Sequence, residues 1–264
     1  MIQEIKNINN LNLTSELKEF PNQGVLWEII EKNQSGKIFE LSGGAILIME
    51  NCPDPFVFIV GLLTDEAIKD TISLVGNLKF PMVYCHPKYH PLFLRLGWNF
   101  HLRTELSLKN LKDTGVPKQH VDIEPIKTLD IFKKCFRYKE QSQLYGSDKN
   151  FLMHGTGYAL CLGLQVVSEV YASIGGDYAE IGVITHPDYR GKGYGRQIVS
   201  HLITQCFNTK ITPKWSCNVD NRSSLHTAMK LGFEINRYYT LLVPDRGNVL
   251  CSNLANWLKN NSYP

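Results

Sequence analysis

The sequence predicts an α+β protein built on a mixed sheet, and two stretches of the chain carry this prediction. Residues 181–185 form an apolar run typical of a buried strand, and a turn with glycines at 191, 193 and 195 follows it. Residues 214–219 have the pattern of a second short strand. A segment with helical apolar spacing follows each strand, and this alternation favours a sheet flanked by helices.

The second half of the chain gives the order of elements most clearly. A short strand is expected from Val121, and a helix after Thr128, whose hydroxyl suits the N-cap position. Glycines 175 and 176 indicate a hairpin turn before the strand that leads into the glycine-rich segment. Gly232 suits the C-cap of the last helix. The expected strands are 157–164, 166–173, 178–185 and 214–219.

The first half is predicted to be α+β as well. Its apolar spacing and turn residues predict the following elements in order: a helix at 24–34, strands at 37–41, 45–50 and 56–62, a helix at 65–76, a strand at 82–85, a short helix at 91–96 and a strand from Gly97 and Trp98.

The glycine-rich segment has the features of an anion site. A strand that turns through glycines into a helix N-terminus exposes backbone N–H groups, and the helix dipole adds positive potential behind them. The segment is not a nucleoside-triphosphate loop, because Arg196 and Gln197 follow Gly195 where a lysine and a hydroxyl residue would be needed. The G-x-G-x-x-G spacing of dinucleotide sites is also absent. The sequence therefore predicts a site for another anion, such as a pyrophosphate.

Two motifs resemble those of the GNAT superfamily of acyl-CoA-dependent N-acetyltransferases. Residues 190–195, Arg-Gly-Lys-Gly-Tyr-Gly, resemble its R/Q-x-x-G-x-G/A signature. About 30 residues later, a strand and helix match its second motif at Asn221, Ser224, Lys230, Gly232 and Phe233. The chain is thus identified as a member of the superfamily. Residues 180–193 and 213–221 are further similar to a bacterial branch that includes zwittermicin A resistance acetyltransferases.

The resemblance implies a GNAT fold in the C-terminal half and acetyl-CoA as the co-substrate, with no metal. The backbone of residues 190–196 would hold the pyrophosphate, and the preceding strand would offer main-chain hydrogen bonds to the pantetheine arm. Asn221 would contact that arm from the other side. The expected cofactor-binding residues are Val183, Thr185, Arg190, Gly191, Lys192, Gly193, Tyr194, Gly195, Arg196, Asn221 and Ser224.

Acetyl transfer to an amine needs a group that removes a proton from the incoming ammonium. Glu180 is the first candidate, because it lies on the strand before the cofactor loop, where many family members carry an acid. Burial there would raise the pKa of its carboxyl towards neutrality. Glu169 is the second candidate. The alternative for Glu180 is an exposed strand residue or a member of an ion pair.

The sequence departs from the family pattern at position 228, where an alanine replaces the tyrosine that often protonates the leaving thiolate. Either no general acid is needed or another residue serves. Tyr238, Tyr239, His226 and Cys217 are alternatives, and Cys217 also leaves an acyl-cysteine mechanism open.

The first half contains an echo of the second. Residues 89–98 end in Leu-Gly-Trp much as residues 225–233 end in Leu-Gly-Phe, but no glycine-rich loop precedes them. One interpretation is a degenerate GNAT-like repeat, and the other is an unrelated α+β cap. The predicted domains are residues 1–117, residues 118–246 and a tail, residues 247–264, with a short helix.

Composition excludes several function classes. The net charge of +3 comes from dispersed lysines and arginines, which disfavours nucleic acid as a partner. The seven cysteines form no C-x-x-C pair, and no apolar run approaches the ~20 residues that span a bilayer. Without a secretory signal, the prediction is a cytoplasmic protein with no membrane partner, its oligomeric state, a homodimer included, left open.

The predicted function is acetyl transfer from acetyl-CoA to a primary amine of a small molecule, such as an amino-containing antibiotic or metabolite. Two alternatives stay open at this point. One is acetylation of a protein amine, and the other is a non-catalytic acyl-CoA-binding sensor or scaffold.

Overall fold

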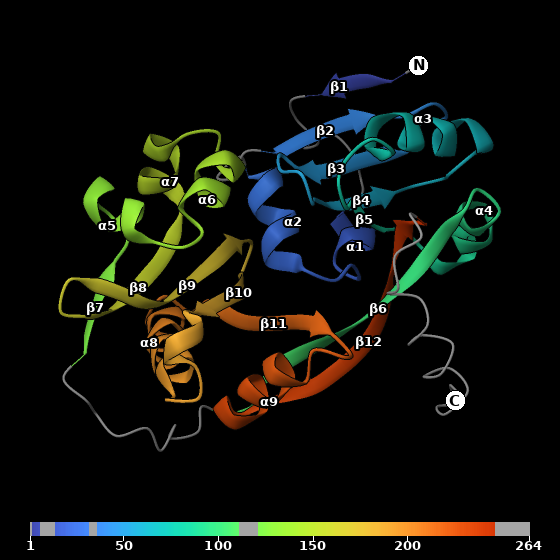
Figure 1. The fold of residues 1–264 in the computed structure, drawn as a ribbon. Helices are drawn as coiled ribbons and strands as arrows, with labels where there is room; N and C mark the ends of the chain where they lie inside the picture. The colour runs from blue at the N-terminus through green and yellow to red at the C-terminus, as the bar shows by residue number, and fades with distance from the viewer. Residues whose placement is uncertain (1, 6–13, 32–35, 111–120, 246–264) are drawn as a thin grey trace.

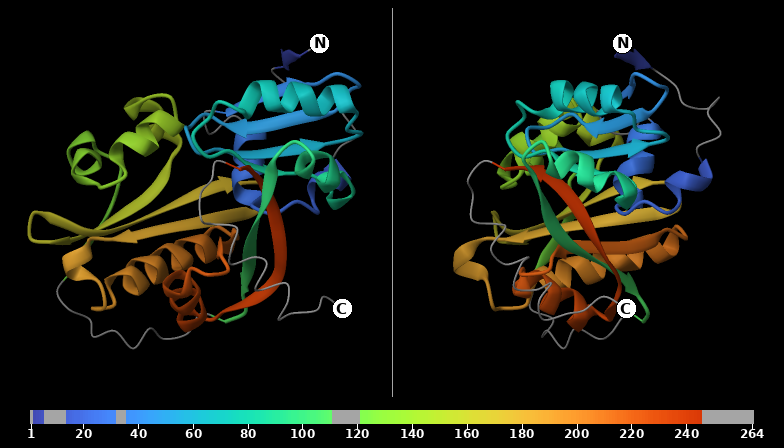
Figure 2. Two further views of the ribbon diagram at one scale, coloured as in Figure 1. Left: turned by 45° about the vertical axis from the view of Figure 1, so that its right-hand side comes forward. Right: turned by 90° about the vertical axis from the view of Figure 1, so that its right-hand side faces the viewer.

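The computed structural model describes residues 2–5, 14–31, 36–110 and 121–245 (Figure 1). Within these residues one twelve-stranded sheet runs through the whole molecule, in the order β1-β2-β3-β4-β5-β12-β6-β11-β10-β9-β8-β7. Helices flank the sheet on both faces (Figures 1 and 2). The predicted α+β class with a mixed sheet is confirmed.

The N-terminal half forms a meander followed by a parallel crossover. Strands β1 to β4 pair antiparallel in sequence order, and β4 pairs parallel with β5 across α3. The elements are β1 (Gln3–Ile5), α1 (Thr14–Leu17), α2 (Gln23–Ile30), β2 (Gly36–Glu40), β3 (Ile46–Glu50), β4 (Phe56–Val60), α3 (Asp65–Val75), β5 (Met82–Tyr84), α4 (His90–Leu94) and β6 (Trp98–Leu108).

The C-terminal half follows the same plan. Strands β7 to β10 form an antiparallel meander, and β10 pairs parallel with β11 across α8. The elements are β7 (Asp122–Pro125), α5 (Leu129–Lys134), α6 (Tyr138–Leu144), α7 (Asp148–His154), β8 (Thr156–Leu162), β9 (Gln165–Gly175), β10 (Tyr178–Thr185), α8 (Tyr194–Asn208), β11 (Thr212–Asn218), α9 (Arg222–Leu231) and β12 (Phe233–Pro244). Thr128 caps α5 and Gly232 ends α9 with a φ of 99°, as expected. The short helices α6 and α7 were not foreseen.

The two halves exchange their last strands. Strand β6 of the N-terminal half lies between β11 and β12, and it pairs with β11 from Ser107–Lys214 to Arg103–Asn218. Strand β12 of the C-terminal half pairs in turn with β5, through Leu242 and Val83. Figure 2 shows β6 and β12 running side by side from one half to the other. Each half therefore completes the sheet of the other.

The halves share one element order, but among the described residues only the second has a glycine-rich loop before its crossover helix. In β4-α3-β5-α4-β6 and in β10-α8-β11-α9-β12, the parallel pairing places Phe58 where the other half has Glu180. Helix α3 begins five residues after β4 ends, and the side chain of Thr64 caps it. Asp65 and Glu66 lie in its first turn, where their charge disfavours a bound anion. This order supports the interpretation as a degenerate repeat.

The predicted domain limits stay a prediction. The boundary at 117/118 falls in residues 111–120 and the tail from 247 onward falls in residues 246–264, and both lie outside the described residues. Among the described residues, no helix combines the length and the apolar composition that a bilayer crossing needs.

Helix α2 of the N-terminal half packs directly on the sheet of the C-terminal half. A Cβ added to Gly24 would lie 2.7 Å from the backbone nitrogen of Glu180 and still closer to the carbonyl oxygen of Ser173. A Cβ added to Gly175 on β9 would clash with the backbone of Trp27 and Glu28. Glycine is required at both positions because the two backbones approach too closely for any side chain. This approach brings the start of α2 to the centre of the sheet.

Candidate active site

The site lies where the parallel strands β10 and β11 diverge. They pair only from Tyr178–Thr212 to Glu180–Lys214, although β10 continues to Thr185 and β11 to Asn218. Beyond this point β10 is held by β9 alone and β11 by β6 alone. The facing edges of β10 and β11 therefore leave main-chain groups available to a ligand.

One cavity, of about 600 Å³, lies beyond the point of divergence, between the C-terminal end of β10, the glycine-rich loop and α9. Gly191 and Gly193 have φ values of 76° and 87°, and Gly193 is the N-cap of α8. The first turn of α8 has no acidic side chain, in contrast to that of α3. The N-terminus of α8 thus presents unopposed positive potential to this cavity.

All the expected cofactor-binding residues except Lys192 line this cavity. The Lys192 Nζ donates to the carbonyl oxygen of Asp188 at 3.1 Å and lies 4.9 Å from the centre of the Tyr189 ring. Arg190 Nε donates to the carbonyl oxygen of Thr185 at 3.1 Å, which ties the loop to the end of β10. Asn221 accepts a hydrogen bond from the backbone N–H of Ser224 at 3.1 Å and so caps α9.

The sequence analysis did not name several lining residues as cofactor-binding, although it placed Lys230 in the second motif and His226 among the alternatives for a general acid. Ser223, His226, Thr227 and Lys230 follow the spacing of one face of α9, so the prediction of Asn221 and that helix already implied them. Ile184, Tyr189 and Trp215 also line the cavity. Only the folded structure brings Trp215 there, where its Nε1 donates to Ser224 Oγ at 3.0 Å.

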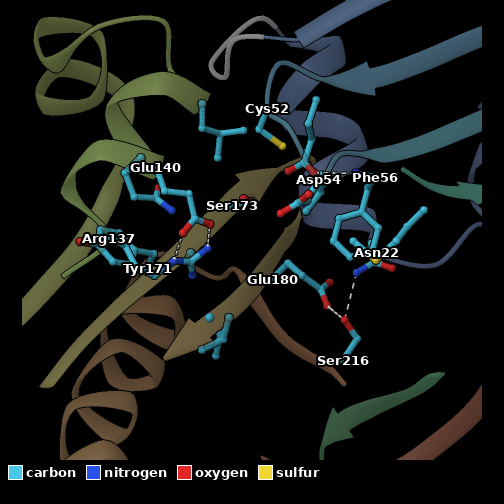
Figure 3. Close-up of a pocket in the computed structure, with 18 of the residues that line it drawn as sticks. Asn22, Cys52, Asp54, Phe56, Arg137, Glu140, Tyr171, Ser173, Glu180 and Ser216 are labelled. Carbon is cyan, nitrogen blue, oxygen red and sulfur yellow. Dashed lines mark hydrogen bonds and ion pairs between the residues drawn. The ribbon is translucent and has the colours of Figure 1, made fainter. Parts of the chain in front are cut away.

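A second cavity, of about 400 Å³, lies on the other side of the same point, between the two halves (Figure 3). The beginning of α2 and residues 50–56 contribute to it from the N-terminal half, and α6, β9, β10 and β11 from the C-terminal half. Residues 180–182 of β10 line this cavity, whereas residues 183–185 line the first one. The two cavities therefore adjoin along a single strand.

Glu180 lines the second cavity. Its Oε1 accepts a hydrogen bond from Ser216 Oγ at 2.7 Å, as Figure 3 shows. Its Oε2 is buried and has no hydrogen-bond partner among the described residues. Burial raises the pKa of Glu180 to about 7, against the lowering effect of the Ser216 hydrogen bond and of Arg103. A group with this pKa can both take up and release a proton near neutral pH.

A buried hydrogen-bond network extends from Glu180 into both halves. Asn22, the N-cap residue of α2, donates from Nδ2 to Ser216 Oγ at 3.0 Å. The Tyr239 hydroxyl donates to Asn22 Oδ1 at 2.8 Å and accepts from Arg103 Nε at 3.0 Å. Strands β6 and β12 bring Arg103 and Tyr239 here because of the strand exchange.

Glu169, the second predicted base, lines neither cavity. Its side chain is fully buried and accepts hydrogen bonds from the backbone N–H groups of Phe136 and Arg137 at 2.7 and 2.8 Å. It thereby holds the start of α6, from which Arg137 reaches the second cavity and pairs with Glu140. The geometry thus places Glu169 in a supporting position, away from Glu180.

The charges around the second cavity favour a cationic guest. Its acidic lining residues are Glu50, Asp54, Glu140 and Glu180, against two arginines, Arg103 and Arg137. Arg137 is already paired with Glu140, and Arg103 donates to Asn218, Tyr239 and Ser216. Asp54 also pairs with Lys79 at 3.7 Å, and Arg103 keeps its charge because the groups to which it donates are neutral. The four carboxylates of the lining still outnumber its two arginines, which favours an ammonium group.

The four alternatives for a general acid differ in burial and position. Ala228 is fully buried in the core below α9. Cys217 is buried, and burial raises the pKa of its thiol, which does not favour a nucleophilic thiolate. Tyr239 is held by Asn22 and Arg103, Tyr238 is 41% exposed, and His226 alone of the four lines the first cavity. Within the described ranges, no group of His, Cys, Asp and Glu is arranged to hold a metal ion.

Comparison with known proteins gives consistent matches. The family described as GNAT acetyltransferase matches residues 98–242, more than half of the chain, starting at the first residue of β6. An uncharacterized N-acetyltransferase of Bacillus subtilis, YdfB, is 31% identical over 128 residues, and the match spans 48% of each chain, about half the length of that relative.

Two solved structures resemble the whole tandem fold. A GCN5-related N-acetyltransferase-like protein of Streptococcus suis has a TM-score of 0.69 at 20% identity, over 87% of this chain and 96% of its own. A tandem GNAT protein from the clavulanic acid biosynthesis pathway has a TM-score of 0.59 at 10% identity, over 92% of this chain and 97% of its own. At these identities the likeness concerns the fold alone.

Proposed function

Because the chain belongs to the GNAT acetyltransferase family, we propose that it transfers an acetyl group from acetyl-CoA to a primary amine of a small molecule by direct attack on the thioester. The observation that carries this proposal is that the two cavities adjoin along β10. A glycine-rich anion site lies on one side and the free carboxylate oxygen of Glu180 on the other. The thioester would span the junction, near residues 182 and 183.

The residues on both sides of the junction suit the reaction. An amine enters as an ammonium ion, and Glu180 Oε2 accepts its proton. The amine nitrogen then forms a bond to the thioester carbonyl carbon, the carbon–sulfur bond breaks, and coenzyme A leaves as the thiolate. The nitrogen loses its second proton, which the thiolate takes up through solvent, so that the products are the amide and free thiol. Main-chain N–H groups on the open edge of β10 would stabilise the negative charge that develops on the carbonyl oxygen. The thiolate of coenzyme A is a tolerable leaving group near neutral pH, which is compatible with Ala228.

The second cavity supports a small molecule as the acceptor. Its volume of about 400 Å³ lies in the usual range of small-molecule sites, and it is walled by both halves of the chain. Its excess of carboxylates suits an amino-containing compound. An amino-containing antibiotic or metabolite is therefore the acceptor that we propose.

The first test is calorimetric titration with acetyl-CoA. The wild-type protein should bind in the micromolar range, and Gly193→Glu should not, because a carboxylate at the N-cap of α8 would repel the pyrophosphate. Gly163→Glu is the matched control, since Gly163 also has a positive φ but lies in the turn between β8 and β9. Absence of wild-type binding would overturn the proposal.

The second test separates an enzyme from a sensor. Release of free thiol should depend on an added amine, and Glu180→Gln should lower kcat by about 10²–10⁴-fold, the usual contribution of a general base, while acetyl-CoA affinity stays unchanged. Binding of acetyl-CoA with no thiol release for any small amine or amine-bearing peptide would favour the sensor. Release only with peptides would favour a protein acceptor.

A further inference from the structure

We propose that Asn22 of the N-terminal half is a positioning residue that fixes the direction of a hydrogen-bond chain from Arg103 to Glu180. Through this chain the half without a cofactor loop would hold the Glu180 side chain ionised and aimed at the second cavity. The catalytic consequence rests on the proposed function of Glu180 as the base, whereas the hydrogen-bond chain itself does not.

The direction of the chain follows from its two ends. An arginine guanidinium can only donate hydrogen bonds, and an ionised carboxylate can only accept them. Arg103 Nε donates to the Tyr239 oxygen, and the Tyr239 hydroxyl proton then goes to Asn22 Oδ1. The other end of the same amide, Nδ2, donates to Ser216 Oγ. Every proton between the two ends is therefore directed towards Glu180.

Ser216 is the last member of the hydrogen-bond chain before the Glu180 carboxylate. A serine hydroxyl has one proton and two lone pairs. Its oxygen accepts from Asn22 at 3.0 Å and from Arg103 Nη2 at 3.4 Å, so its proton remains for Glu180 Oε1 at 2.7 Å. The other carboxylate oxygen, Oε2, is buried without a hydrogen-bond partner among the described residues, and in the proposed function it accepts the proton of the amine.

Asn22 has an unusual backbone conformation, and hydrogen bonds of the preceding turn keep it in place. Its φ and ψ of 55° and 44° lie in the left-handed region, which asparagine tolerates better than most residues, and its side chain is 1% exposed. The preceding turn is fixed by Gln23 Nε2, which donates to the carbonyl oxygens of Leu17 and Phe20. Arg237 of β12 donates to the carbonyl oxygens of Glu19 and Phe20.

Other charged groups near Glu180 bear on its titration. Glu105 on β6 raises its pKa, and Arg103 on β6 and Lys214 on β11 lower it. Across the cavity Arg137 and Glu140 of α6 neutralise each other, and Glu28 lies farther along α2. Asn22 itself is uncharged. Any effect of replacing it with a neutral residue therefore reports the hydrogen bond alone.

The test measures the titration of Glu180 directly. In protein labelled with ¹³C at the glutamate carboxyl, the Glu180 resonance is the one that Glu180→Gln removes. Asn22→Asp cannot donate to Ser216, so the serine proton is shared between two carboxylates. The midpoint of Glu180 should then rise by more than one hydrogen bond to a charged group would give, because the new carboxylate also repels the Glu180 charge. Asn22→Gly keeps the left-handed backbone and adds no charge, so its expected rise of about 1 to 2 pH units reports the lost hydrogen bond.

Ser216→Ala and the pH profile complete the design. Ser216→Ala removes the final donor and should raise the midpoint at least as far as Asn22→Gly does. The acid limb of the kcat–pH profile should move with the midpoint in every variant, while KM for acetyl-CoA stays constant. A folded Asn22→Gly protein with an unshifted Glu180 midpoint would overturn the inference. A shifted midpoint in a protein without amine-dependent thiol release would sink only the proposed function.

Discussion

Substitution of Gly24 by alanine tests whether the packing of α2 on the sheet keeps the site in order. The added Cβ would lie 2.7 Å from the backbone nitrogen of Glu180, whereas ordinary contacts begin at 3.4 Å. The two nearest atoms, Ser173 O and Glu180 N, belong to the backbone of β9 and β10 and cannot move away by a change of rotamer. The carbonyl oxygen of Ser173 is closer still, at 2.4 Å, so helix α2 must retreat by about 1.0 Å to restore an ordinary contact. Over-packing of this kind costs about 1–3 kcal/mol in unfolding free energy.

The same movement acts on catalysis. Asn22 is the N-cap of α2, and a retreat of the helix would stretch its 3.0 Å bond to Ser216 beyond hydrogen-bonding range. We therefore expect two effects in Gly24→Ala: a melting temperature lower by roughly 2–10 °C, and a kcat lower by about tenfold at pH 7.

Differential scanning calorimetry and thiol release at saturating acetyl-CoA would measure the two effects. Gly163→Ala is the control, since a Cβ there meets nothing within 4 Å, so its cost is limited to the strain of a positive φ. A Gly24→Ala protein with the melting temperature and kcat of the wild type would refute this account of the α2 packing.

Three further predictions follow from individual residues. Burial raises the pKa of Glu28 from 4.5 to about 8, so its contribution to stability is complete below pH 4.5 and is lost as the pH rises to 8. Glu28→Gln should flatten this fall of a few kcal/mol in a series of urea titrations, and an unchanged slope would contradict it. Thr64→Ala removes the cap of α3 and should cost about 1 kcal/mol of unfolding free energy without changing acetyl-CoA affinity, as a titration would show. In the wild type, kcat should rise tenfold per pH unit below about 7 and level off above, because Glu180 must be ionised; a flat profile from pH 6 to 8 would argue against it.

The glycine-rich loop could be predicted because its conformation depends on local sequence. Three glycines between a strand and a helix impose the turn, and the turn itself creates the anion site. The matching second motif then located Asn221 and the start of α9. Glu180 could also be predicted from the sequence, because it lies three residues before Val183 on the strand that leads into the loop. Each of these predictions needed only neighbours in the chain.

The acceptor side could not be predicted in this way. Asn22 and Ser216 are 194 positions apart, and Arg103 reaches Tyr239 only because β6 pairs with β12. No periodicity within one half indicates that its last strand belongs to the sheet of the other. Glu169 shows that the position of an acid in the sequence does not reveal what its carboxylate contacts. It is an acid on the strand next to β10, but its carboxylate is used by two backbone N–H groups.

From the strand exchange we can predict how residues 118–246 behave when they are produced alone. Without β6, strand β11 loses the pairing from Lys214 to Asn218, and β12 loses its partner along most of its length. Leu106 of β6 is fully buried in the same core as Trp215 and Phe233, so its removal also opens that core. We expect residues 118–246 alone to lack a cooperative unfolding transition.

Co-expression gives the decisive comparison. Residues 1–117 and 118–246 produced together as separate chains should associate, because each needs the exchanged strand of the other. The complex should bind acetyl-CoA and recover Asn22 and Arg103 at the acceptor side. If residues 118–246 alone unfolded cooperatively and released thiol with an amine at the wild-type kcat, the N-terminal half would not be part of the active site. The proposed role of Asn22 would then fall with it.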